Sequence, residues 1–136
     1  MNQQPEFDVL LECLLKISTH FGQTINSEAI LANLPVPDQG LTPKLLLSAA
    51  SRAGFVAEFK KQDIDSLKGS QQASVVLLKN NRAAIYIPQT SGNEACFLIA
   101  DQQGNFSKTN PVSIKNLTIG FHILLKPLAD LSLIHI

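Results

Sequence analysis

The hydrophobic period of this chain changes at Gly54, and that change limits the folds open to it. Between residues 7 and 53, apolar side chains recur at steps of three and four, the spacing of one face of a helix. After Gly54 they gather in short extended runs bounded by turn residues. Helices followed by strands predict an α+β domain, with the helices packed on one face of an antiparallel sheet. The length of 136 residues suits one domain.

Three helices are predicted before Gly54. The first ends at Gly22, which suits a left-handed C-cap. The second ends near Pro35, because the residue before a proline avoids the helical conformation. Thr42 and Pro43 supply the N-cap and the first residue of the third helix. The predicted helices are residues 7–21, a short segment that Asn26 or Ser27 caps and that carries Ile30, Leu31 and Leu34, and residues 43–53.

The strands predicted after Gly54 form an antiparallel meander. Asn80 and Asn81 tolerate the positive φ angles of a tight hairpin turn, so the runs on either side of them should pair. A second hairpin crosses residues 101–105, and residues 64–67 are predicted as a connecting turn. The predicted strands are residues 55–59, 74–79, 82–87, 95–100, 106–109 and 120–126.

Composition excludes several classes of function. The 11 basic and 11 acidic side chains cancel, and no basic run is longer than Lys60-Lys61, so binding to nucleic acid is not expected. Apolar runs such as 75–78 are far shorter than the roughly 20 residues that span a bilayer. The first residues lack the basic and apolar regions of a secretory signal, so the expected compartment is the cytoplasm.

Residues that could carry chemistry are few. Cys13 and Cys96 are too far apart in the sequence for a disulfide framework or a zinc motif, and both are interpreted as buried thiols. The three histidines are scattered, so no metal site is expected. Phosphate-loop, dinucleotide, zinc-protease and nucleophile-elbow motifs are absent from the sequence. Without further information, no residue stands out as catalytic.

The helical region nevertheless resembles a known family. Residues 8–22 run from an aspartate to Phe21-Gly22 without a gap, like the first helix of the bacteriocin-processing, papain-like cysteine peptidases found at the N-terminus of ABC exporters. Leu34-Pro35, 41–46 and 49–55 resemble the degenerate branch of that family, the peptidase-like domain of type I secretion ABC transporters that export RTX toxins and large adhesins. The resemblance covers about residues 3–127 and implies the papain-like cysteine peptidase fold.

The resemblance also assigns positions to the catalytic groups. Active members have a cysteine nucleophile after the helix-opening aspartate, and this chain has Val9 there. The oxyanion glutamine corresponds to Gln3, and the histidine base to Ile85 or, with a shift, Ala84. The aspartate that orients the histidine corresponds to Asp101. Because the nucleophile and base positions carry no reactive atom, the resemblance implies an inactive peptidase.

Each of these residues also has a structural interpretation. Cys13 is one turn after Val9, but mid-helix, where the helix dipole does not activate a thiol, so it is interpreted as a buried hydrophobe. Asp101 is either a retained triad residue or an Asx-turn residue. Gln3 is either a relic donor or a solvated side chain. Tyr86 either lines the former cleft or covers the sheet. The candidates for substrate contact are therefore Gln3, Val9, Ile85 and Tyr86.

The function implied is that of a binding or docking domain. It would hold an unfolded secretion substrate and contact the membrane and nucleotide-binding domains of a parent transporter, at the cytoplasmic face of the bacterial inner membrane. No cofactor is expected in this domain, and ATP and magnesium would bind only the parent's nucleotide-binding domain. The alternatives are an active peptidase that cleaves leader peptides and a purely structural docking module. Residues 1–127 would form the domain, and the apolar residues 128–136 would be a linker start or a cloning scar.

Overall fold

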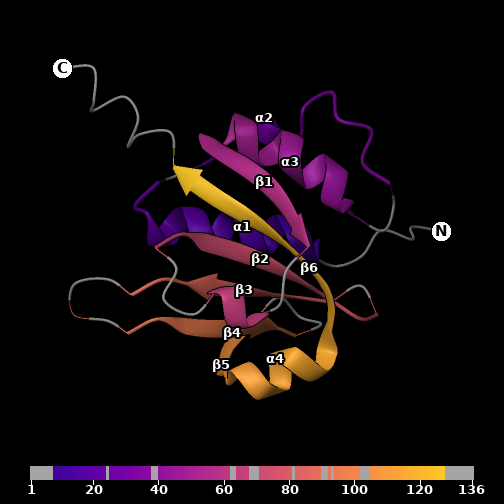
Figure 1. Ribbon diagram of the computed structural model, residues 1–136. Coiled ribbons are helices and arrows are strands. Elements are labelled where there is room, and N and C mark those ends of the chain that lie inside the picture. Colours follow the sequence, from indigo (N-terminus) through magenta and orange to yellow (C-terminus); the bar gives the residue numbers. More distant parts are fainter. Residues whose placement is uncertain are drawn as a thin grey trace.

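The computed structural model describes residues 8–23, 25–37, 40–61, 64–67, 71–80, 82–89, 92, 94–101 and 105–127. Within them, three helices precede a sheet whose strands are interrupted by one 3-10 turn and one further helix (Figure 1). The elements are α1 (Val9–His20), α2 (Ser27–Leu31), α3 (Pro43–Arg52), β1 (Phe55–Lys61), η1 (Ile64–Leu67), β2 (Ala73–Leu78), β3 (Ala83–Ile87), β4 (Cys96–Ala100), β5 (Phe106–Thr109), α4 (Pro111–Leu117) and β6 (Thr118–Pro127).

Local sequence accounts for the helix ends. Asp8 caps α1, Asn26 caps α2 and Thr42 caps α3, each through a side-chain oxygen that accepts a backbone N–H of the first turn. Gly22 follows α1 with a φ of 74°. Leu34 lies beyond the end of α2 because Asn33, with a φ of 66°, turns the chain first, so its predicted place in that helix is wrong.

The sheet is antiparallel throughout, with the strand order β1-β6-β2-β3-β4-β5. The two predicted hairpins are confirmed by the pairing of β2 with β3 and of β4 with β5. The predicted simple meander is wrong at one place, because the last strand, β6, lies between β1 and β2. Strand β2 is therefore central, which explains why every one of its residues is buried.

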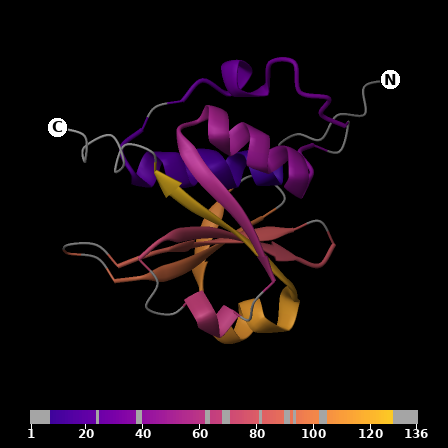
Figure 2. The same ribbon diagram turned by 45° about the horizontal axis from the view of Figure 1, so that its top comes forward.

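Helices cover both faces of the sheet. Helices α1, α2 and α3 lie on one face, and η1 and α4 lie on the other (Figure 2). The prediction that the helices pack on one face is thus correct for the three N-terminal helices and missed α4. Asn110 caps α4 and Pro111 is its first residue, the same pattern that opens α3.

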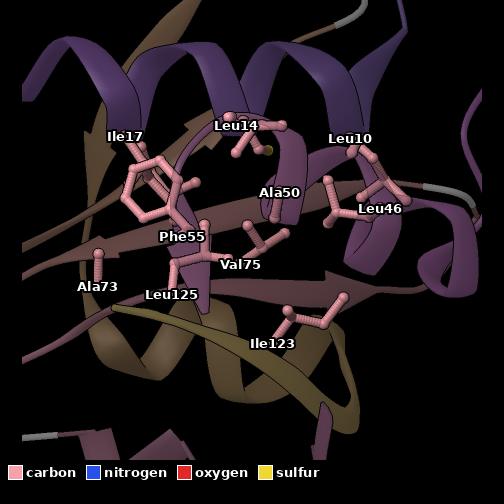
Figure 3. Packing of buried hydrophobic residues seen from close by; sticks show 14 of the residues in the cluster. Leu10, Leu14, Ile17, Leu46, Ala50, Phe55, Ala73, Val75, Ile123 and Leu125 are labelled. Carbon is pink, nitrogen blue, oxygen red and sulfur yellow. The ribbon is translucent and has the colours of Figure 1, made fainter. Parts of the chain in front are cut away.

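The main core lies between the N-terminal helices and the sheet. Leu10, Leu14 and Ile17 of α1 point toward the sheet, and they belong to the same buried cluster as Val75 and Ile123 of the strands (Figure 3). Phe55 of β1 lies near Ile17 in this core and is 1% exposed (Figure 3). A smaller cluster on the opposite face packs η1 and α4 against the even-numbered residues of β2 and β3. No helix within the described ranges is long and apolar enough to cross a bilayer.

Candidate functional site

The first helix begins at a carboxylate that is bound twice. Asp8 Oδ1 accepts the N–H of Leu11 at 3.3 Å, as an N-cap does, and Asp8 Oδ2 accepts the N–H of Leu41 at 2.7 Å. Gly40 packs directly on this carboxylate, since a Cβ at that position would lie 2.8 Å from Asp8 Cγ. The φ of Gly40 is +108°, which also favours glycine. Asp8 therefore fixes the loop before α3 against the start of α1.

A pocket of about 380 Å³ opens beside this junction, and we call it the Val9 pocket. Its walls come from the start of α1, the loop before α3, β2, the β2–β3 turn and β6. Among the described residues of the lining, Arg82 is the one that is cationic, and Ile119, which is 50% exposed, lies at the β6 side. The lining residues are Asp8, Val9, Leu10, Pro37, Gly40, Leu41, Thr42, Pro43, Leu77, Leu78, Arg82 and Ile119.

Val9 gives the pocket an apolar side chain at the helix N-terminus. The backbone N–H groups of a first helical turn and the helix dipole stabilise an anion there. A thiol at this position would therefore be activated as a thiolate, but the valine side chain has no atom that can attack a carbonyl or carry a charge. Together with Leu10, Leu41 and Leu77, it makes a surface suited to apolar groups.

The residues expected at the histidine position do not reach this pocket. Ile85 is fully buried beneath α1 and pairs with Val75, and it is not part of the pocket lining. Ala84 packs in the cluster on the opposite face of the sheet. Ala83 is instead the β3 residue that pairs with a lining residue, Leu77, on the face that carries α1. None of the three alanine and isoleucine side chains can transfer a proton.

Tyr86 lies on the other side of the sheet from Val9. It is 2% exposed and its ring contacts the ring of Phe97, with centroids 5.1 Å apart, in the cluster that η1 and α4 cover. Strand alternation explains this placement, because Ile85 faces α1 and its neighbour must face away. The structure thus does not bring Tyr86 together with Val9, and of the two interpretations it agrees with a ring that covers the sheet.

Asp101 directly follows β4 and shapes the turn after it. Its backbone N–H donates to the carbonyl of Asn105, and its Oδ1 accepts the N–H of Asn105 at 2.9 Å. This is the turn chemistry that the sequence offered as one interpretation. Asp101 is exposed and is not part of the lining of the Val9 pocket. Gln3, the proposed relic donor, lies outside the described residues, as does the tail from 128 to 136.

The two cysteines differ in environment. Cys13 is fully buried, and burial raises the pKa of its thiol, with the carboxylates of Glu12 and Asp8 adding to the effect. Its interpretation as a buried hydrophobe is confirmed. Cys96 is only partly buried, at the start of β4, so the expectation that both thiols are buried is wrong for Cys96. No group of three or more metal-binding side chains occurs in the described part of the chain.

Two features of the pocket are not predictable from local sequence patterns. Arg82 lines it because the β2–β3 turn ends next to the start of α1, a long-range contact that a local pattern does not encode. The bond from Leu41 to Asp8 joins residues 33 apart and is equally non-local. Gly40 carried a usable signal, since a glycine directly before an N-cap segment marks a backbone that a side chain would obstruct.

Comparison with known proteins identifies the family. A profile of the Peptidase C39 family matches residues 1–127, which is nearly the whole chain. This chain belongs to the Peptidase C39 family. The three N-terminal helices on an antiparallel sheet are the papain-like α+β arrangement of C39 domains, as the resemblance implied. No curated protein matches the chain in sequence.

Solved C39 structures share the fold. The N-terminal peptidase C39-like domain of a toxin secretion ATP-binding protein from Vibrio parahaemolyticus superposes with a TM-score of 0.75 at 24% identity, covering 89% of this chain and 98% of that domain. A double-glycine motif protease from an AMS/PCAT transporter, in complex with a leader peptide, gives 0.67 at 16% identity and coverages of 88% and 84%. The peptidase domain of Streptococcus ComA, a bifunctional ABC transporter, gives 0.64 at 18% identity and coverages of 91% and 96%.

Proposed function

We propose that this C39 domain is catalytically inactive and binds an unfolded secretion substrate for a type I secretion ABC transporter. The observation that carries the proposal is Val9, which stands at the first position of α1 and lines the Val9 pocket. A C39 peptidase needs a thiolate at that place, and valine converts the same place into an apolar contact. The site is retained as a pocket while its reactive group is absent.

The walls of the pocket fit the side chains of an extended polypeptide. Burial of one Leu- or Val-sized side chain stabilises a complex by roughly 1.5–3 kcal/mol before the costs of association are subtracted. An unfolded passenger exposes such side chains, whereas a folded one hides them. Arg82 at the same pocket adds a cation that can pair with a carboxylate of the passenger. The site thus favours unfolded over folded chains.

Neither cysteine of the chain takes the place of the missing nucleophile. The thiol of Cys13 is buried with a raised pKa, and Cys96 lies in a different part of the molecule from the Val9 pocket. In the proposal, the parent transporter supplies the energy through ATP and magnesium at its nucleotide-binding domain. The domain described here would sit at the cytoplasmic face of the inner membrane and contact the parent's membrane and nucleotide-binding domains.

A titration of the full chain against C-terminal RTX segments, unfolded without calcium and folded with it, tests the proposal. We expect binding to the calcium-free form only. Val9→Asp should weaken it about tenfold or more, because a carboxylate in the pocket must be desolvated against the apolar passenger. Val112→Asp, on the exposed surface of α4, is the matched control and should bind like the native chain. Equal binding to both forms, or none, would overturn the proposal.

The rival activity is tested with a double-glycine leader peptide. The chain should leave the peptide intact, because no thiol reaches the position of the nucleophile. Mass spectrometry of the incubated peptide gives the answer, and Val9→Cys serves as a probe of whether the pocket still accepts a nucleophile. Cleavage by the native chain that alkylation abolishes would establish an active peptidase instead.

A further inference from the structure

A second hollow runs along the C-terminal half of α1, away from the Val9 pocket. It has a volume of about 750 Å³ and lies between α1 and the strands β4 and β5. Lys16 and His20 form its helix side, and Lys108 of β5 stands on the strand side. None of its lining residues belongs to the Val9 pocket. We call this hollow the α1–β4 groove.

The floor of the α1–β4 groove is apolar. Ile87 at the end of β3 is 8% exposed, and Leu98 of β4 is partly buried against the main core. Cys96 lies on the same face of β4 as Leu98, two residues earlier, and its thiol is partly accessible. A ligand that enters the groove can therefore bury apolar atoms against Ile87 and Leu98.

Within the part of the chain that the structure describes, neither of the two lysines beside this floor has a carboxylate partner. The ion pairs among the described residues are Lys60 with Glu58 and Lys115 with Asp65, and neither Lys16 nor Lys108 takes part in one. The Lys16 ammonium lies 5.9 Å from the centroid of the Phe106 ring, beside the groove. Glu94 is the single carboxylate among the described residues that line the groove. With Lys16, Lys108 and one carboxylate, the groove has a positive balance within a chain whose formal net charge is zero.

We propose that the α1–β4 groove binds an acidic segment of polypeptide that carries an apolar anchor residue. The anchor lies on Ile87 and Leu98, and carboxylates on either side of it meet Lys16 and Lys108. The charge balance selects an acidic partner over a basic one, and the apolar floor selects a peptide over a free anion. This surface is separate from the Val9 pocket, so it extends the proposed function without depending on it.

The binding test uses the full 136-residue chain and a fluorescein-labelled peptide of three Glu-Leu-Glu-Ser repeats. Fluorescence anisotropy should show binding that weakens with added salt, because exposed charges are screened. The double variant Lys16→Gln, Lys108→Gln should weaken it about fivefold to tenfold, as expected for two exposed charge pairs. The matched control Lys61→Gln, Lys126→Gln removes two exposed lysines at the opposite edge of the sheet and should bind like the native chain.

Peptide chemistry provides a second comparison. Glu-Ser-Glu-Ser repeats, which lack the anchor, and Lys-Leu-Lys-Ser repeats, which reverse the charge, should both bind more weakly than the first peptide. Equal binding of the Glu-Leu and Lys-Leu peptides would overturn the assignment of an acidic partner. Equal binding of the native chain and the groove variant would overturn the site.

Cys96 reports directly on occupancy of the groove. Because Cys13 is fully buried, the rate at which a maleimide alkylates the folded chain measures the accessibility of Cys96. Saturating Glu-Leu peptide should slow this alkylation at least threefold in the native chain and in Val9→Asp, but not in the groove variant. An unchanged rate in the native chain would overturn the proposal. If the calcium-free RTX segments fail to bind while this protection persists, the proposed function fails and the groove stands.

Discussion

Asp8 is the residue on which the start of the fold depends most directly. Its two carboxylate oxygens bind two different N–H groups, one in α1 and one in the loop before α3. The first bond is a helix cap and the second is a tertiary contact between segments distant in sequence. A single side chain thereby sets both the beginning of the helix and one wall of the Val9 pocket.

Replacement of Asp8 separates these two contributions. Asp8→Ala should lower the free energy of unfolding by about 2 kcal/mol, because it removes the cap and leaves the Leu41 N–H without its acceptor. Asp8→Asn keeps one acceptor oxygen and should cost about half as much. Urea denaturation measures both. An asparagine variant as unstable as the alanine variant would show that charge, and not the number of acceptors, is what matters.

His122 is a titratable side chain buried in the sheet. It lies in β6 and is 2% exposed, and its Nε2 has no hydrogen-bond partner among the residues that the structure describes. Burial, with a smaller contribution from the Lys60 ammonium, lowers its pKa below the ordinary value, so stability should depend on pH through this group. The folded state therefore favours the neutral ring. This contribution to stability is complete above about pH 6.5, the value in the unfolded chain, and is lost as the pH falls toward the lower folded pKa.

We expect the free energy of unfolding to fall between pH 7 and pH 5, and His122→Gln to flatten that dependence. Urea denaturation at a series of pH values measures it. A slope that persists unchanged in His122→Gln would assign the pH dependence to other groups.

At the scale of elements, the sequence predicts a helix or a hairpin correctly where the residues at its ends have a strong conformational preference. Thr42 with Pro43, and the two asparagines before Arg82, mark a helix start and a hairpin turn by their own conformational preferences. The position of β6 between β1 and β2 has no such local mark, because strand order is decided by pairing between distant residues. The sequence hints at this order only through β2, whose continuous apolar run is typical of a strand that is buried on both faces.

In the candidate site, too, the position of the residue marked by local signals was predicted correctly, and that of the residue that depends on strand register was not. Val9 follows from the resemblance and its neighbouring cap, so its place at the start of α1 was predictable. Ile85 was placed by counting residues back from Asp101 without a gap, and the register instead pairs Ala83 with the pocket wall. A count along the chain does not determine which residues two strands bring together, because loop length and register are set by tertiary packing.

Helix α4 shows how a short element is held by its packing. It has only seven residues, too few for a stable isolated helix, and its one fully buried side chain is Ile114. Ile114→Ala should lower the free energy of unfolding by about 2–4 kcal/mol, because it leaves a cavity between η1 and the sheet. Val112→Ala on the same helix, where the side chain is 68% exposed, should change it by less than about 0.5 kcal/mol. Thermal or urea unfolding checks the pair, and equal effects would mean that α4 packs loosely.

At the scale of the whole molecule, the described residues form two hydrophobic clusters on one sheet, and Cys13 lies in the larger one. In a thiol assay with Ellman's reagent, the folded chain should release one equivalent quickly, from Cys96, and the second only on unfolding. The slow phase therefore measures opening of the core around α1. Cys96→Ser should abolish the fast phase and leave the slow one. A fast reaction of Cys13 in that variant would contradict the burial seen here.

The placement of β6 also has a consequence for synthesis on the ribosome. The strand that joins β1 to the rest of the sheet is made last, and its pairing with β1 brings residues 55 and 127 together. A nascent chain that has emerged only as far as β5 holds β1 with no neighbouring strand. The sheet is therefore completed late, when residues 118–127 leave the exit tunnel. Until then, the backbone N–H and C=O groups of β1 and β2 that will pair with β6 remain accessible to chaperones.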